Sequence, residues 1–176
     1  MKLHELLETI FSKDPYDMID FGSTDLERFQ SRISDATLKK QISKNAEIHF
    51  VNYAGKFWIL TVDRIPVAFL ELGIRYKIGD NYYHSVELIY SLKSFRKTVI
   101  LGKFFIELRK LLEHPLIIGS GKSGGLVFPD GFELIKGLAK SNHFTLYSLN
   151  LKTGELSDFD PNEDLKTSAG KTIVFK

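Results

Sequence analysis

The segment from Tyr82 to Leu112 changes its hydrophobic period once, and this change constrains the fold more than any other feature of the chain. From Tyr82 to Leu92 apolar residues alternate with more polar ones, which predicts a β-strand. After a short turn, apolar residues recur every three or four positions from Val99 to Leu112, which predicts an amphipathic helix. A sheet strand that leads directly into a helix therefore lies at the centre of the predicted fold.

The turn between this strand and this helix is a candidate anion site. The first backbone amides of a helix lack intrahelical partners and attract negative charge. Arg96, Lys97 and Lys103 add positive charge at this point. Basic residues at a helix start are often only solvated, and most corners of this kind bind nothing, so both interpretations stay open.

Length and composition limit the class of protein. A chain of 176 residues with 43% hydrophobic residues can build one domain with a hydrophobic core, and we expect a single domain. The absence of Cys excludes disulfides, thiolate zinc sites and Cys nucleophiles. The five His residues are scattered along the sequence, so we expect no metal site.

The charge balance bears on partners and location. Twenty-four basic and 22 acidic side chains leave a net charge of +2, which does not favour a general nucleic-acid-binding surface but leaves a local patch open. Residues Met1 to Ser12 carry Glu5 and Glu8 within their apolar pattern, unlike a signal peptide. No apolar run reaches transmembrane length. We expect a soluble cytoplasmic protein with no membrane partner.

The remaining periodicity predicts an α/β (α+β) fold with a mixed, mostly antiparallel central sheet of about six to seven strands flanked by helices. Residues 1–45 are expected to form N-terminal helices, with Leu38 and Ile42 on a helical face, and 46–150 the core sheet and helices. Residues 151–176 are expected to be a polar tail with a final edge strand at Thr172–Phe175. The core elements expected are strands near 47–53, 57–62, 67–76, 82–92, 115–119 and 144–149, with helices at 99–112 and 130–141.

Two carboxylates, Glu71 and Glu87, fall on adjacent predicted strands. A carboxylate can act as a general base if burial raises its pKa toward the working pH. The commoner alternative is that each side chain points to solvent from a half-exposed sheet. Aromatic residues on the strands also permit a stacking platform for single-stranded nucleic acid, although their spacing favours the core: Tyr53, Phe57, Trp58, Tyr76, Tyr82 and Tyr83.

The order of elements resembles the GNAT N-acetyltransferase superfamily over roughly residues 20–150. Phe57 to Leu70 resembles the family's hairpin, with an Asp-containing turn and a Pro-Val before the second strand. Glu87 to Leu112 resembles its strand, pyrophosphate loop and central helix, and Phe132 to Tyr147 its last helix and following strand. The resemblance is one of pattern and implies a GNAT-like fold.

The resemblance also implies an activity, namely acyl transfer from acetyl-CoA or another acyl-CoA to an amine. It places Glu87 where some members have their base, and Arg96 at the first position of the loop that binds the pyrophosphate. The acceptor would be an amine or protein of unknown identity, and further protein partners and oligomer formation stay open. The implied cofactor-binding residues are Ile89, Ser91 and Leu92 for the pantetheine arm and Arg96, Lys97, Thr98, Gly102 and Lys103 for the diphosphate.

Three departures from the family pattern support an alternative. Val99 and Leu101 occupy the two small positions of the loop, Gly102 is displaced by one, and Ala139 stands where a Tyr often protonates the leaving thiolate. The alternative is a catalytically inactive GNAT-fold binding or assembly protein, of a type that includes phage-encoded members. A nucleic-acid-binding module that uses the aromatic strands is a third class.

Overall fold

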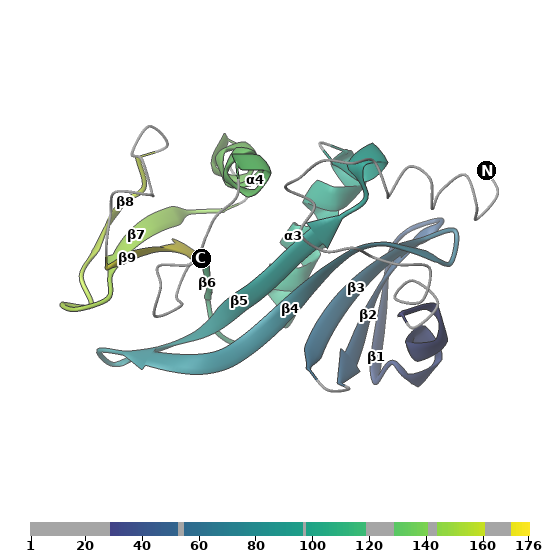
Figure 1. The fold of residues 1–176 in the computed structure, drawn as a ribbon, viewed down its shortest axis with the longest axis horizontal. Coiled ribbons are helices and arrows are strands. Elements are labelled where there is room, and N and C mark those ends of the chain that lie inside the picture. The colour runs from purple at the N-terminus through teal and green to yellow at the C-terminus, as the bar shows by residue number, and fades with distance from the viewer. Residues whose placement is uncertain (1–28, 53–54, 97, 119–128, 141–143, 161–169) are drawn as a thin grey trace. The chain divides into compact units, whose positions relative to one another are not determined.

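A computed structural model of the protein describes residues 29–52, 55–96, 98–118, 129–140, 144–160 and 170–176 (Figure 1). These residues form a mixed α+β fold in which a large, mostly antiparallel sheet dominates and helices are few. The sheet has nine strands in the order β1-β2-β3-β4-β5-β6-β9-β7-β8. The mixed, mostly antiparallel character was predicted correctly, but the predicted count of six to seven strands is too low.

The elements have the following bounds. The strands are β1 (Leu38–Ser43), β2 (Ala46–Asn52), β3 (Lys56–Val62), β4 (Ile65–Ile78), β5 (Asn81–Ser91), β6 (Leu116–Ile118), β7 (Leu146–Asn150), β8 (Leu156–Asp158) and β9 (Lys171–Phe175). The helices are α3 (Val99–Leu111) and α4 (Pro129–Lys140), with 3₁₀ turns η1 (Ile33–Asp35) and η2 (Lys93–Phe95). A helical turn over residues 29–32 precedes η1.

The chain divides into two compact units. The first comprises Met1–Leu70 and Tyr90–Phe104, and the second comprises Glu71–Ile89 and Phe105–Lys176. Strands β4 and β5 and helix α3 each contribute residues to both units.

The first unit is built on an antiparallel meander. Strand β1 pairs with β2 from Leu38↔Phe50 to Ser43↔Ala46, with a register shift between Gln41 and Ser43. Strands β2 and β3 pair along their full length, from Ala46↔Val62 to Asn52↔Lys56. Antiparallel neighbours joined by short turns need no crossover helix, so this part of the sheet follows chain order.

The predicted helical face that continued through Leu38 and Ile42 to about Asn45 is wrong, because these two residues belong to β1. A spacing of four residues returns to the same face both in a helix and in a strand, so this pair alone cannot distinguish the two. The exposure of β1 alternates at Leu38, Lys39, Lys40 and Gln41, as expected for a strand with one face covered.

Aromatic rings fill the core of the first unit. The Phe29 ring lies 5.5 Å from that of Phe57 and 5.0 Å from that of Phe69, measured between centroids. Phe69 in turn stacks on Tyr90 at 5.8 Å. A cavity of about 10 Å³ lies among Phe29, Phe69, Tyr90 and their neighbours, which is room for about one water molecule.

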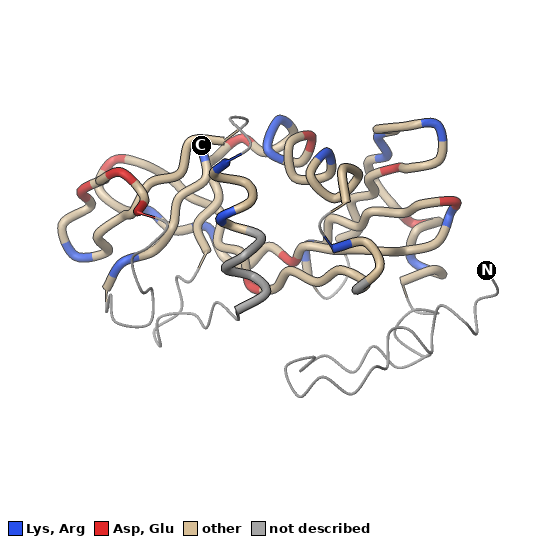
Figure 2. The backbone as a smooth tube through the Cα atoms, turned by 90° about the horizontal axis from the view of Figure 1, so that it is seen from above, with Lys and Arg blue, Asp and Glu red and all other residues tan. Residues whose placement is uncertain are grey.

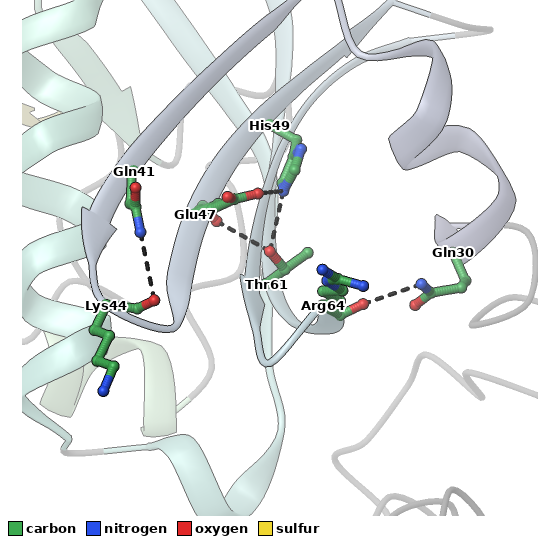
Figure 3. Close-up of polar contacts among 7 residues, drawn as sticks. All are labelled: Gln30, Gln41, Lys44, Glu47, His49, Thr61 and Arg64. Atoms are coloured by element: carbon green, nitrogen blue, oxygen red, sulfur yellow. Dashed lines mark hydrogen bonds and ion pairs between the residues drawn. The ribbon is translucent and has the colours of Figure 1, made fainter.

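The two-residue turn between β3 and β4 adopts an uncommon conformation. Asp63 and Arg64 have φ angles of 51° and 66°, in the left-handed region that hairpin turns of type I′ require at both positions. Gln30 donates a hydrogen bond from Nε2 to the Arg64 carbonyl at 3.0 Å, as Figure 3 shows. The helical turn at 29–32 is thereby attached to this hairpin.

The second unit combines one parallel pair of strands with antiparallel pairs. Strand β6 runs parallel to β5 over three pairs, His84↔Leu116 to Val86↔Ile118. Strand β9 pairs antiparallel with both β6 and β7, and β8 pairs with β7. One cluster of its buried core comprises Tyr83, Ile117, Leu149 and Val174.

The segment Thr172–Phe175 forms the predicted strand, but its predicted place at an edge is wrong. Strand β9 lies between β6 and β7, and its last four residues are buried. The run Ile173-Val174-Phe175 is uninterruptedly apolar, which is typical of a strand covered on both faces. Strands β1 and β8 are the two that the sequence did not predict, and β8 is a short, exposed strand at the edge.

The other core elements were predicted to within a few residues. Helix α3 begins at Val99 as expected, and α4 spans Pro129–Lys140. Residues 1–28 of the predicted N-terminal helices and residues 161–169 of the predicted polar tail lie outside the described residues. No helix in the described ranges is long and apolar enough to cross a membrane.

Two leucines on the paired strands β7 and β8 test the assigned core. Leu149 is fully buried, whereas its partner Leu156 is 37% exposed. We expect Leu149→Ala to lower the free energy of unfolding by about 2–5 kcal/mol because it leaves a cavity. Leu156→Ala removes the same atoms and should cost less than about 1 kcal/mol. Chemical denaturation of both variants measures the difference, and equal losses would contradict this position of the core.

Candidate functional site

The residues predicted to form a site fall into two groups. Glu87 and Ile89 belong to the second unit, and Ser91, Leu92, Arg96, Thr98, Gly102 and Lys103 belong to the first. Lys97 lies outside the described residues. Each group is considered within its own unit.

Thr98 caps the start of helix α3. Its Oγ1 accepts a hydrogen bond from the Leu101 amide at 3.4 Å and donates one to the Phe95 carbonyl at 2.6 Å. The Gly102 amide donates to the Thr98 carbonyl at 3.3 Å and so begins the regular helical ladder. A Thr side chain in this position satisfies an amide that would otherwise be available to a ligand.

Two amides remain available at this helix start. No described residue accepts a hydrogen bond from the backbone N–H of Val99 or of Ile100. Val99 and Leu101, which stand at the two loop positions where the GNAT pattern has small residues, differ in exposure. Leu101 is buried, whereas Val99 is 78% exposed. Within the described residues, the anion site predicted here therefore offers two amides and the cations beside them.

The turn before α3 is held by main-chain contacts. Leu92 is buried, and its amide donates to the Val67 carbonyl at 2.8 Å. Arg96 is half-buried and donates from Nε to the Ser91 carbonyl at 3.4 Å. Lys103 is exposed on α3. A Cβ at Gly102 would meet no atom within 4 Å, so this position does not itself require glycine.

The second unit brings Glu71 and Glu87 together, as their places on adjacent predicted strands suggested. The Glu87 side chain lies over Gly73, where a Cβ would approach its Oε1 to 1.9 Å. Ser85 donates from Oγ to the same Oε1 at 3.0 Å, and its Oγ also lies 2.9 Å from the Ile74 carbonyl. A glycine and a buried serine thus determine where the exposed Glu87 carboxylate lies.

The electrostatics of this pair favour a proton at Glu71. Desolvation by burial raises the pKa of Glu71, and the negative charge of Glu87 raises it further. Both causes disfavour the charged carboxylate. A carboxyl group with a raised pKa beside an exposed carboxylate can take part in proton transfer closer to neutral pH.

Strand β5 extends beyond its described pairs with β6. These pairs run from His84↔Leu116 to Val86↔Ile118, where a described range ends, and β5 continues to Ser91.

A buried polar cluster in the first unit was not predicted as a unit (Figure 3). His49 is 3% exposed, and its Nε2 lies 3.0 Å from Thr61 Oγ1 and 3.4 Å from Glu47 Oε2. No described residue bonds to its Nδ1. Desolvation lowers the pKa of His49, the Glu47 carboxylate opposes this, and Lys39 adds to the lowering. From the sequence, this cluster could have been predicted only by aligning β2 with β3 in the correct register, which pairs Glu47 with Thr61.

The histidines do not form a metal centre within the described ranges. No group of three or more metal-ligating side chains occurs there. However, two histidines that are far apart in the sequence meet in the second unit, with the rings of His84 and His114 5.4 Å apart.

Comparisons with known proteins do not assign a family. No protein-family model matches the chain, and no curated protein is significantly similar to it. Among solved structures, the chain is similar to a crystal structure of a protein of unknown function from Aquifex aeolicus VF5, with 13% identity and a TM-score of 0.33. The match covers 85% of this chain and 76% of the other.

The raised pKa of Glu71 has a consequence for stability. Because the folded state binds the Glu71 proton more tightly than the unfolded state, stability from this group is present below pH 4.5 and is lost as pH rises through the folded pKa. At pH 7 we expect Glu71→Gln to raise the free energy of unfolding by about 0.2–1 kcal/mol, as for a relieved like-charge pair. Urea midpoints measured at pH 7 and pH 4 should show the gain only at pH 7. Asp158→Asn, on exposed β8, is the control, and an equal gain there would contradict the assignment.

His49 should produce the opposite pH dependence. Its lowered pKa means that the unfolded state binds the proton more tightly, so stability from this group is present above pH 6.5 and is lost as pH falls through the folded pKa. The melting temperature should therefore decline below pH 6.5, and this part of the decline should vanish in His49→Gln. His114→Gln, which changes a histidine of the second unit, should retain it. An unchanged pH profile in His49→Gln would show that this histidine is not the group responsible.

Proposed function

We propose that the chain is a GNAT-like, acyl-CoA-dependent N-acyltransferase that acts on an amine. The observation that carries this proposal is the carboxylate pair of Glu71 and Glu87, in which Ser85 and Gly73 position the Glu87 carboxylate. The two carboxyl groups come from the neighbouring strands β4 and β5 within the second unit. An amine that attacks a thioester needs a proton acceptor, which a carboxylate can supply.

The backbone of β5 supplies the proposed binding contact for the pantetheine arm. Amides and carbonyls from Glu87 to Ile89 alternate in direction along the strand. The amide groups of an extended pantetheine chain can pair with them as an added strand would. Acyl-CoA would supply the activated acyl group, and its C–S bond would break as the amide bond forms, so that CoA leaves as the thiol.

Glu87 is the proposed base. An ammonium group must lose a proton before its nitrogen can attack a carbonyl carbon, and the exposed Glu87 carboxylate can accept that proton. Ser85 and Gly73 hold this carboxylate in position. Glu71 is the second carboxyl group of the pair, and its negative form would add to the attraction for a cationic amine.

We propose the start of α3, within the first unit, as a separate contact for a diphosphate. No described residue accepts a hydrogen bond from the amides of Val99 and Ile100, which can donate to phosphate oxygens, and Arg96 and Lys103 supply positive charge. These donors fit the oxygens of one phosphate group. They are fewer than a glycine-rich loop would offer, because Thr98 already takes the Leu101 amide.

A second candidate function follows from this capped helix start. A catalytically inactive GNAT-fold protein that serves in binding or assembly, of the phage-encoded kind, would have no need of a phosphate loop. The Thr98 cap and the exposed Val99 favour this candidate.

A cytoplasmic location and an unidentified amine or protein acceptor complete the proposal for the enzyme.

Ligand-dependent melting and turnover separate the two candidates. If the enzyme proposal is correct, millimolar acetyl-CoA should raise the melting temperature by several degrees, since a ligand at 100 times its Kd adds about 2.7 kcal/mol. Glu87→Gln should then lower turnover by about 10²-fold or more without weakening acetyl-CoA binding, because it removes only the base. Release of CoA thiol in the presence of a panel of primary amines measures turnover.

Asp158→Asn on exposed β8 provides the matched loss of one carboxylate and should turn over normally. A melting shift without turnover on any amine would mean that the chain binds acyl-CoA without transferring the acyl group. No shift at millimolar acetyl-CoA would exclude both acyl-CoA binding and the enzyme proposal.

A further inference from the structure

Three rings form a continuous row on the second unit. The Tyr82 ring lies 5.6 Å from the His114 ring, which lies 5.4 Å from that of His84. Strand β5 carries Tyr82 and His84, and His114 follows the end of α3. The His84 amide donates to the Pro115 carbonyl at 2.9 Å, which brings the segment around His114 against β5.

Two cations of β4 flank this row. The Arg75 guanidinium carbon lies 4.7 Å from the centre of the Tyr82 ring, and the Lys77 ammonium lies 5.8 Å from it. Arg75 also lies 3.5 Å from His114 Nε2 through one terminal nitrogen. We name these five residues, Arg75, Lys77, Tyr82, His84 and His114, the ring patch.

The Tyr82 ring and the two cations of the ring patch are exposed to solvent. Tyr82 is 41% exposed and both cations are exposed, whereas the next residue, Tyr83, is 2% exposed and belongs to the core. Buried aromatic residues are accounted for by packing, but an exposed tyrosine under an arginine is not needed by the core of this unit. One carboxylate opposes the patch, since Glu113 Oε2 lies 3.6 Å from His114 Nε2 and this side chain is 80% exposed.

We propose that the ring patch binds single-stranded nucleic acid. Unpaired bases stack on aromatic rings and on guanidinium planes, while their phosphates bind Arg and Lys. A duplex hides the faces of its bases, so rings in this position favour a single strand. The net charge of +2 and the spread of both signs along the described backbone in Figure 2 argue against a general polyanion surface and leave a local one.

Binding of a fluorescein-labelled 15-nucleotide oligo(dT), followed by anisotropy at low salt, tests this site. Tyr82→Ala should weaken binding by about tenfold, and Tyr82→Phe should restore most of it because the ring remains. An abasic oligonucleotide of the same length has the same phosphates without bases and should bind more weakly than oligo(dT). Thermal melts confirm that the variants are folded.

The salt dependence tests the cations separately. Each cation that contacts a phosphate of a single strand contributes about −0.7 to the slope of log K against log salt. Arg75→Gln should therefore reduce the slope by about 0.7, whereas Lys44→Gln, an exposed lysine of the first unit, should leave it unchanged. Glu113→Gln removes the opposing carboxylate and should tighten binding.

Three results would overturn the proposal. The first is no binding of oligo(dT) at low salt. The second is equal affinity for oligo(dT) and the abasic strand, which would mean that the patch attracts anions without stacking bases. The third is unchanged affinity in both Tyr82→Ala and Arg75→Gln, which would place any binding elsewhere.

Discussion

The main-chain hydrogen bonding between β4 and β5 fixes the positions of most side chains in the second unit to which we assign a role. These are the two longest strands of the sheet, and they are joined by a tight turn in which Gly79 has a φ angle of 59°. Side chains alternate between the faces of a strand, so a slip of one residue would exchange exposed Tyr82 with buried Tyr83. Burial of Tyr83 with Ile117, Leu149 and Val174 makes that slip costly. Core packing therefore specifies which groups the hairpin presents to ligands.

Hydrophobic period was sufficient for most of the fold. The change of period after Leu92 correctly placed the start of α3 at Val99, and alternation located β2 to β5. It was insufficient at Leu38 and Ile42, because a separation of four residues satisfies a helix and a strand alike. It was also insufficient for β9, where the local pattern showed a strand but the place in the sheet depends on pairing with residues 55 to 59 positions away.

Only the part of the candidate site that is formed by strands consecutive in the sequence could be predicted. Glu71 and Glu87 could be placed together because their strands follow each other in the chain. The Thr98 cap could not be foreseen as a competitor for the Leu101 amide, since the sequence only showed a helix beginning nearby. His84 and His114 are 30 positions apart, and the loop between α3 and β6 that carries His114 has no periodic signal. Side-chain position within a short loop depends on tertiary contacts that propensities do not contain.

The interior place of β9 also shapes the order in which the second unit can assemble. During synthesis, β6 and β7 leave the ribosome before residues 171–175, so the two strands that β9 will separate are made first. Until β9 arrives, each of them has an unpaired backbone edge, and such edges promote association between chains. The meander of β1 to β3 lacks this delay because each strand pairs with the one made just before it. Nascent chains stalled between β7 and β9 would thus be the ones most in need of a chaperone.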